Sequence, residues 1–183
     1  MDSESHRRYQ PAMVSTYYPN TILLDHPVMT DGAKESYGAD ILTLLHSEKI
    51  FVVNSRRRNG LILFKGYHAE FAGPGAAVGG NYDHDCEMVL LLGNLSLVTP
   101  ESYEERQKAY LIRRQWTRLI KQITESPLPE QRVRKIIDQF EQYFSPSIVA
   151  QMPDIVFALL VGVLPRTVGI VRRFGNELNE ALM

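Results

Sequence analysis

The run His84–Asp85–Cys86–Glu87 gathers four side chains of types that do chemistry. His84 and Cys86 alternate, so in a strand they would share one face. An imidazole and a thiolate placed there could ligate a metal or haem, or the thiol could sense oxidation. The alternative is that Cys86 is a small apolar core residue, as buried free cysteines usually are, and that His84 lies in a loop.

Three arginines near the end of the chain, Arg166, Arg172 and Arg173, gather positive charge on or beside one predicted helix. The preceding helix is predicted to end at Gly162, four residues after the small Ala158. A small residue, a glycine turn and a second helix are typical of a helix-turn-helix, although any apolar helical hairpin can share this spacing. The apolar residues expected at the turn and on the inward face of the second helix are Val163, Val168 and Val171.

The sequence shows no catalytic constellation. Its five histidines are scattered, and no Ser/His/Asp set, metal-ligand spacing or carboxylate pair fills the roles of an active site. The glycine-rich run AGPGAAVGG lacks the Lys-Ser/Thr ending and the helix start of a phosphate-binding P-loop. A single cysteine allows no internal disulfide and no cysteine-built cluster. We therefore expect no enzyme, no metal and no cofactor.

Composition limits the remaining classes. The 183 residues carry 20 Lys and Arg against 21 Asp and Glu, so a nucleic-acid binder would need its positive charge gathered in one place. The longest apolar runs, Ile155–Val161 and Met88–Leu92, are too short to span a bilayer, and the N-terminal region lacks the apolar core of a secretory signal. We expect a cytoplasmic protein with no membrane contact.

The elements that must position these groups are predicted to be strands in the first part of the chain and helices in the second. Residues 1–20 are polar, and from 21 to 100 short apolar or β-branched runs alternate with turn residues, which indicates an antiparallel sandwich or barrel. Asn59–Gly60, between two such runs, predicts a hairpin because both residues tolerate positive φ. The runs predicted as strands are TILL (21–24), ILTLL (41–45), KIFVV (49–53), LILF (61–64), EMVLLL (87–92) and LSLV (95–98).

Helices are predicted from residue 99 onward. Thr99 and Pro100 supply a cap and a first helical position for a helix that runs to about residue 126 and carries an a/d seam. The seam could join two copies of the chain or pack on the chain's own domain, because it is shorter than the roughly three to four heptads that indicate a coiled coil. Its residues are Ala109, Ile112, Trp116, Leu119 and Ile123.

The order of these features resembles the cyclic-AMP receptor superfamily of bacterial transcription regulators. The resemblance rests on YYPNTILL as the opening strand, RRRNGLILF as a hairpin, GYHAEFAG as the lip of the effector pocket, LSLVTPESYEE as the entry to the long helix, and PEQRVRKII with LLVGVLPRTVGIVRRF as the DNA-binding part. It implies an α+β fold in four parts. These are a polar N-terminal segment (1–20), a jelly-roll-like β-roll sensor domain (21–100), a dimerisation helix (101–126) and a helix-turn-helix domain without an evident wing (127–183).

The resemblance also implies a function, namely transcription regulation by a homodimer that is joined at the seam and binds a palindromic site in double-stranded DNA. Arg166 is expected to pair with a guanine edge, Thr167 with a phosphate and Ile170 with a thymine methyl group. Arg172 and Arg173 are expected to add further DNA contacts. The implied effector-pocket candidates are Glu70, Phe71, Gly73, His84, Asp85 and Cys86.

Two positions depart from the family pattern. Pro74 follows Gly73 where cyclic-nucleotide binders carry a Glu, and no Arg accompanies Asp85 where those binders place one on the phosphate. A cyclic nucleotide would be repelled there, so we expect another small-molecule or protein effector, or none. The alternative function is a relative that no longer binds DNA and uses the apolar Ile155–Val161 face to bind a protein partner.

Overall fold

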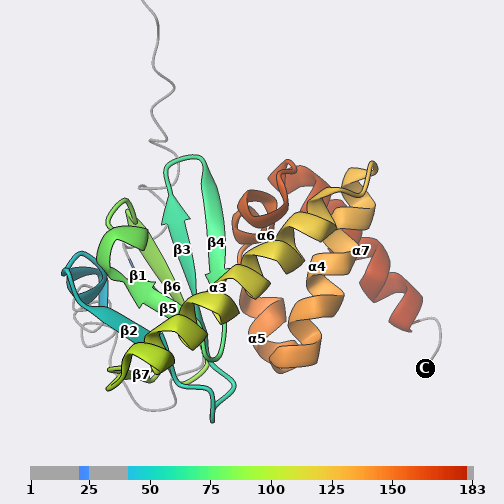
Figure 1. Ribbon diagram of the computed structural model, residues 1–183. Coiled ribbons are helices and arrows are strands. Elements are labelled where there is room, and N and C mark those ends of the chain that lie inside the picture. The colour runs from blue at the N-terminus through green and yellow to red at the C-terminus, as the bar shows by residue number, and fades with distance from the viewer. Residues whose placement is uncertain (1–20, 25–40, 181–183) are drawn as a thin grey trace, which may run out of the picture.

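Strands make up the first half of the described chain and helices the second half (Figure 1). The computed structural model describes residues 21–24 and 41–180, so the polar segment 1–20 lies outside the described residues. The strands are β1 (Thr21–Leu24), β2 (Ile50–Val53), β3 (Gly60–Lys65), β4 (His68–Ala72), β5 (Ala77–Gly79), β6 (Met88–Leu92) and β7 (Leu97–Val98). The helices are a short stretch at 41–45, the 3₁₀ turn η1 (Gly80–Tyr82), α3 (Tyr103–Thr124), α4 (Pro129–Tyr143), α5 (Pro146–Gln151), α6 (Asp154–Val161) and α7 (Pro165–Glu180).

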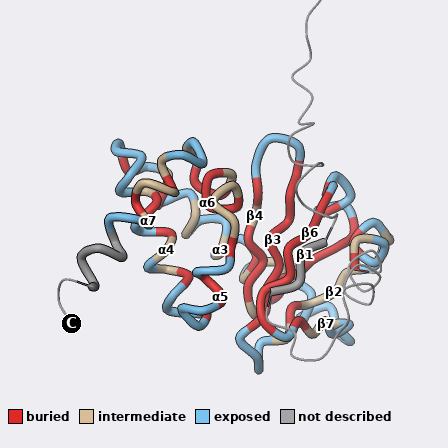
Figure 2. Tube along the Cα trace, turned by 180° about the vertical axis from the view of Figure 1, so that it is seen from behind, coloured by how far each residue is buried: buried red, intermediate tan, exposed pale blue. Residues whose placement is uncertain are grey.

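The strands form two small sheets, with the orders β1-β6-β3-β4 and β5-β2-β7. Neighbouring strands are antiparallel except β1 and β6, which pair in parallel. Side chains alternate across β3, so Ile62 joins one apolar cluster while Leu61 and Leu63 join another. Strands β3 and β6 are therefore buried on both faces, as the red tubes in Figure 2 show. The expected α+β class is confirmed, but the sheets contain one parallel pair.

The run ILTLL at 41–45 is a helix and not the predicted strand. Ile41 and Leu45, four residues apart, are 4% and 0% exposed, whereas Leu44 is 38% exposed. This spacing places the two buried side chains on one helical face against the core. A short apolar run does not by itself distinguish a helix from a strand, and here tertiary packing decides the outcome.

Asn59–Gly60 does not form the predicted hairpin, because β2 and β3 lie in different sheets. Asn59 is fully buried, and its side-chain amide donates a hydrogen bond to the carbonyl of Asn54 at 2.9 Å. Asn59 thus stabilises the loop between β2 and β3 from its buried side. The tight hairpin joins β3 to β4 instead, across Gly66, whose φ is 54°.

Helix α3 starts at Tyr103, slightly later than predicted from Thr99 and Pro100. The cap is Ser102, whose hydroxyl oxygen accepts a hydrogen bond from the backbone N–H of Glu105 at 3.1 Å. The acidic first turn, which includes Glu105, complements the positive end of the helix dipole. The helix then crosses in front of the sheets toward α6 (Figure 1).

The seam on α3 packs against its own chain. Ala109 and Ile123 are buried, and Trp116 lies edge-on to Phe71 with ring centroids 5.0 Å apart. A Cβ added at Gly73 would lie 2.5 Å from the Trp116 ring, so the indole fills the space beside that glycine. The intrachain alternative is therefore correct for this seam. Ile112 and Trp116 pack against the apolar clusters, whereas Leu119 is partly exposed and belongs to neither cluster. A dimer contact through these residues stays a prediction.

Helices α4 to α7 share a core with the first sheet. One apolar cluster runs from Ile62 and Phe71 in the sheet, through Phe140 in α4, to Phe157 in α6 and Val168 in α7. The Phe140 and Phe157 rings meet edge-on, with centroids 5.8 Å apart. The helical part is thus fixed to the sheets by continuous packing.

The apolar face of α6 is occupied within this core. Val156, Phe157, Ala158, Leu160 and Val161 are all buried, and Ile155 and Leu159 are partly exposed. The expectation that Ile155–Val161 offers an open face to a protein partner is therefore wrong. A helix that is apolar nearly all round is buried here by its own neighbours.

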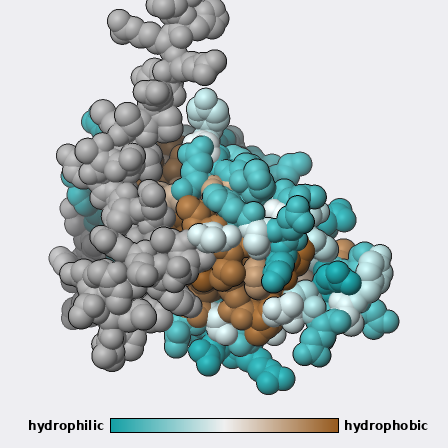
Figure 3. All heavy atoms as spheres, turned by 90° about the vertical axis from the view of Figure 1, so that its left-hand side faces the viewer, coloured by the Kyte–Doolittle hydropathy of each residue, from teal (hydrophilic) through white to brown (hydrophobic). Residues whose placement is uncertain are grey.

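Within the described residues no single helix has the length and apolar character needed to cross a bilayer, and only the bent pair α6 and α7 passes that test jointly. Apolar side chains also reach the surface at the sheet end of the molecule, opposite α7 (Figure 3). Two exposed apolar residues of the described sheet region are Leu44, at 38%, and Val98, at 44%.

Candidate functional site

The turn between α6 and α7 is built on Gly162. Its φ of 64° and ψ of 51° lie in the left-handed region, which ends α6 and lets the Val163 N–H donate to the Ala158 carbonyl at 3.1 Å. A Cβ at this position would meet nothing within 4 Å, so the turn needs glycine for its backbone angle and not for space. The two helices meet at a bend of 115°. That angle and a three-residue turn with glycine are typical of a helix-turn-helix pair.

The inward face of α7 follows the sequence prediction. Val168 and Val171 are 0% and 7% exposed, and Val163 is partly buried at the turn. Ala158 is buried beneath them at 2% exposure. Gly169 lies close to α6, since an added Cβ would be 3.0 Å from the Asp154 carboxylate. The pair is thus locked by small and β-branched residues.

The outward face of α7 carries part of the expected basic group. Arg166 and Arg173 are exposed, and Thr167 and Ile170 are partly exposed. The Arg173 Nε donates a hydrogen bond to the Gly169 carbonyl at 3.2 Å. These four side chains therefore lie wholly or partly at the surface of the molecule.

Arg172 has an internal role. Its Nη1 donates to the Asp154 carboxylate at 2.9 Å, and its Nη2 donates to the Val149 carbonyl at 2.9 Å. The guanidinium also lies over the Phe157 ring, 4.9 Å from the centroid. The arginine thus ties α7 to α5 and α6, and its expected contact with DNA stays a prediction.

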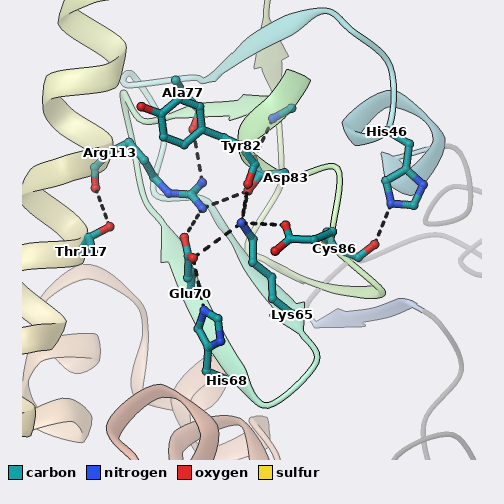
Figure 4. A network of polar contacts seen from close by, with 12 residues as sticks. His46, Lys65, His68, Glu70, Ala77, Tyr82, Asp83, Cys86, Arg113 and Thr117 are labelled. Carbon is teal, nitrogen blue, oxygen red and sulfur yellow. Dashed lines mark hydrogen bonds and ion pairs between the residues drawn. The ribbon is translucent and has the colours of Figure 1, made fainter.

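A second group of charges lies where α3 crosses β4. Arg113 is only 3% exposed, and its Nη2 donates to the Glu70 carboxylate at 2.6 Å and to Asp83 at 3.1 Å (Figure 4). Its Nη1 donates to the Ala77 carbonyl at 3.3 Å. Asp83 is fully buried and accepts a further hydrogen bond from the Gly79 N–H at 2.8 Å. A buried charge is stable only with such partners, so this network holds α3 on the sheets.

Lys65 enters the same network from β3. Its Nζ lies 3.3 Å from Asp83, 3.1 Å from Asp85 and 3.6 Å from Glu70, and it donates to the Tyr82 carbonyl. Two cations therefore face three carboxylates in the cluster that we name the charge cluster. Its members are Lys65, Glu70, Asp83, Asp85 and Arg113.

The pKa values of Glu70 and Lys65 are both shifted in the direction that favours the charged form of each group. Burial acts to raise the pKa of Glu70, but the hydrogen bond and charge of Arg113, with the charge of Lys65, lower it overall. Burial acts to lower the pKa of Lys65, but the carboxylates of Glu70, Asp83 and Asp85 outweigh it and raise that pKa. Lys65 and Glu70 are therefore charged at neutral pH.

A groove of about 570 Å³ opens above the charge cluster, between α3 and the sheet edge. Lys65, Glu70 and Arg113 lie among its lining residues, with Tyr82 from η1. Further lining side chains come from the outer side of α3: Arg114, Thr117, Arg118, Lys121 and Gln122, with Glu125 just beyond its end.

The structure brings together only part of the predicted effector pocket. Glu70 and Asp85 meet through Lys65, whereas Phe71 is buried in the core at 3% exposure and Gly73 lies under Trp116. His84 is exposed, and its ring centroid is 6.1 Å from that of His46. Among the described residues, no group of three or more His, Cys, Asp or Glu side chains could hold a metal ion.

Cys86 is a buried core residue at 2% exposure, as one of the two sequence interpretations held. Its thiol donates to the Met88 carbonyl at 3.2 Å. Burial, together with the nearby Asp83 charge, raises the pKa of the thiol to about 12. A protonated, covered thiol is a poor metal ligand and a poor redox sensor.

Sequence reasoning missed Lys65, Asp83 and Arg113. It found no arginine near the HDCE run, but Arg113 reaches this region from α3, 30 positions away from Asp83. A signal was present in the spacing: Arg113 follows the buried Ala109 by four residues and so shares its inward helical face. A charged residue on an inward face indicates a buried partner.

Comparisons of the chain with protein-family models, with curated proteins and with solved structures gave no match.

Proposed function

We propose that the chain is a transcription regulator that binds double-stranded DNA, with α7 as the helix that enters the major groove. The observation that carries this proposal is the α6–Gly162–α7 pair, with its left-handed glycine turn and 115° bend. That shape leaves Arg166 exposed in the first turn of α7, where helix-turn-helix proteins make their base contacts.

Four residues of α7 offer contacts that DNA can use. Arg166 can donate two parallel hydrogen bonds to a guanine edge, and Thr167 can hold a neighbouring phosphate. Ile170 can contact a thymine methyl group. Arg173 lies two turns along the helix and adds a phosphate contact.

A homodimer on a palindromic site remains part of this proposal, because one hairpin reads only one half-site and helix-turn-helix regulators usually combine two. Because Ala109 and Ile123 are buried within the chain, the α3 seam would contribute to that contact only through the partly exposed Ile112, Trp116 and Leu119. We propose a cytoplasmic location, which DNA binding in a bacterial cell requires. The adaptor alternative loses its surface, since α6 is buried.

The proposal is tested by fluorescence anisotropy of the full chain with random and genomic duplex DNA at low and moderate salt. Binding that weakens as salt rises is expected, because phosphate contacts release counterions. Arg166→Ala should relax sequence preference, and Arg173→Ala should weaken binding to all sequences alike. Lys108→Ala removes an exposed positive charge on α3 and is the matched control. Absence of binding even at low salt overturns the proposal.

A further inference from the structure

The groove above the charge cluster has a basic rim. Arg114, Arg118 and Lys121 follow one another at helical spacings of four and three residues and line the groove from α3. All three are exposed, and within the described residues none of them forms an ion pair. The exposed Glu125, four residues after Lys121, lines the groove beside them, so this rim carries three cations and one carboxylate.

The floor of the groove is of a different kind. Lys65 and Arg113 are buried, and their charges are balanced by carboxylates of the charge cluster. Glu70 has 28% of its side chain exposed and reaches the groove with oxygen atoms that accept hydrogen bonds. The groove thus places hydrogen-bond acceptors at its base and a net positive charge on its rim, where three cations stand with Glu125.

We propose that this groove binds a phosphate monoester of a small, hydroxyl-bearing molecule. The phosphate would lie on Arg114, Arg118 and Lys121, where guanidinium and ammonium groups match its charge and its acceptor oxygens. Hydroxyl groups of the ligand body would donate to Glu70. A monoester carries close to two negative charges at neutral pH, which suits three cations better than the single charge of a diester.

The groove continues toward the proposed DNA-binding hairpin. A neighbouring cleft of about 220 Å³ shares Glu70, Thr117 and Lys121 with the groove and ends at Leu159 and Leu160 of α6. A ligand that extends into this cleft would contact the first helix of the hairpin and bias its position against α3. This regulatory step rests on the proposed function, but the binding of the ligand does not.

Isothermal titration calorimetry of the full chain tests the site with ribose 5-phosphate, glycerol 3-phosphate and adenosine 5′-monophosphate as probes, beside ribose and inorganic phosphate. At least one phosphate ester is expected to bind, and more tightly than either ribose or inorganic phosphate. Arg118→Gln and Lys121→Gln should each weaken that binding about tenfold, the usual effect of losing one charge-assisted contact. Lys108→Gln, also on α3 but outside this groove, should leave it unchanged.

No binding by any of the three esters overturns the site, as does equal binding by inorganic phosphate or equal loss in Lys108→Gln. Displacement of a bound ester by duplex DNA would also overturn it, because the rim would then be a nucleic-acid surface. Circular dichroism shows whether each variant is folded, and the conservative Arg118→Lys should recover part of the affinity of Arg118→Gln. DNA anisotropy without ligand is read separately, so loss of the site and loss of DNA binding are distinguishable.

Discussion

The Nη2 of Arg113 lies 2.6 Å from the Oε2 of Glu70, and this contact joins α3 to β4 across 43 residues of sequence. The same nitrogen lies 3.1 Å from Asp83, so one buried guanidinium holds two carboxylates. Because both acids would face each other without it, the orientation of α3 depends on this arginine.

Arg113→Ala should therefore destabilise the protein strongly. Removing one partner from a buried ion pair leaves uncompensated charge and typically costs about 3–5 kcal/mol. Urea denaturation followed by circular dichroism measures the change in the free energy of unfolding. The control is Arg114→Ala, at an exposed neighbouring position, which should change stability by no more than about 0.5 kcal/mol. Similar losses in the two variants would mean that the charge cluster does not stabilise the fold.

The stability of the chain should depend on pH through Glu70. The pKa of Glu70 is lower in the folded than in the unfolded chain, so the folded state binds fewer protons. The resulting stabilisation is present above the unfolded pKa, about 4.3, and is lost as pH falls through the folded value. Thermal melts from pH 6 down to about pH 3 should bring the wild type and Glu70→Gln closer together.

The matched control for that series is Glu87→Gln, which removes an exposed carboxylate near the same region. If the curves of the wild type and Glu70→Gln stay parallel across the whole range, Glu70 does not carry the acid sensitivity.

Gly162→Ala should destabilise the α6–α7 hairpin. A residue with a Cβ pays about 1–2 kcal/mol in the left-handed region, while the open space around this glycine adds no clash. Gly162→Asn should cost less, because asparagine tolerates this conformation better. Chemical denaturation of the two variants gives the comparison. An alanine variant as stable as the wild type would show that the turn does not require positive φ.

Cys86 should react with iodoacetamide only when the core opens. Its thiol is 2% exposed and its pKa is about 12, so almost no accessible thiolate exists at pH 8. Mass spectrometry should find slow alkylation that accelerates with urea in parallel with unfolding. Fast modification in native buffer would place the thiol at the surface and reopen a redox or metal-binding role.

Much of the fold followed from local pattern. The α6–α7 hairpin could be predicted because Ala158, Gly162 and Val168 satisfy local steric needs that hold in most contexts. The β3 and β6 strands were found from their apolar β-rich runs. The 41–45 stretch was mistaken for a strand, because short apolar runs suit both kinds of element and only packing separates them.

The charge cluster could not be predicted in the same way. Lys65, Asp83 and Arg113 come from three segments, and their meeting depends on how α3 lies across the sheets. The partner of the α3 seam could not be predicted from the sequence either. Its spacing fits a dimer and a domain core equally well, and only the position of Phe71 and Gly73 decides for the core.

Trp116 is the chain's only tryptophan, and it packs against both apolar clusters where α3 crosses them. Its indole Nε1 is buried without a hydrogen-bond partner among the described residues. The emission of this single fluorophore therefore reports on the contact of α3 with the sheets and with α4. A spectral shift on addition of DNA or a phosphate ester would record movement of that helix without any label.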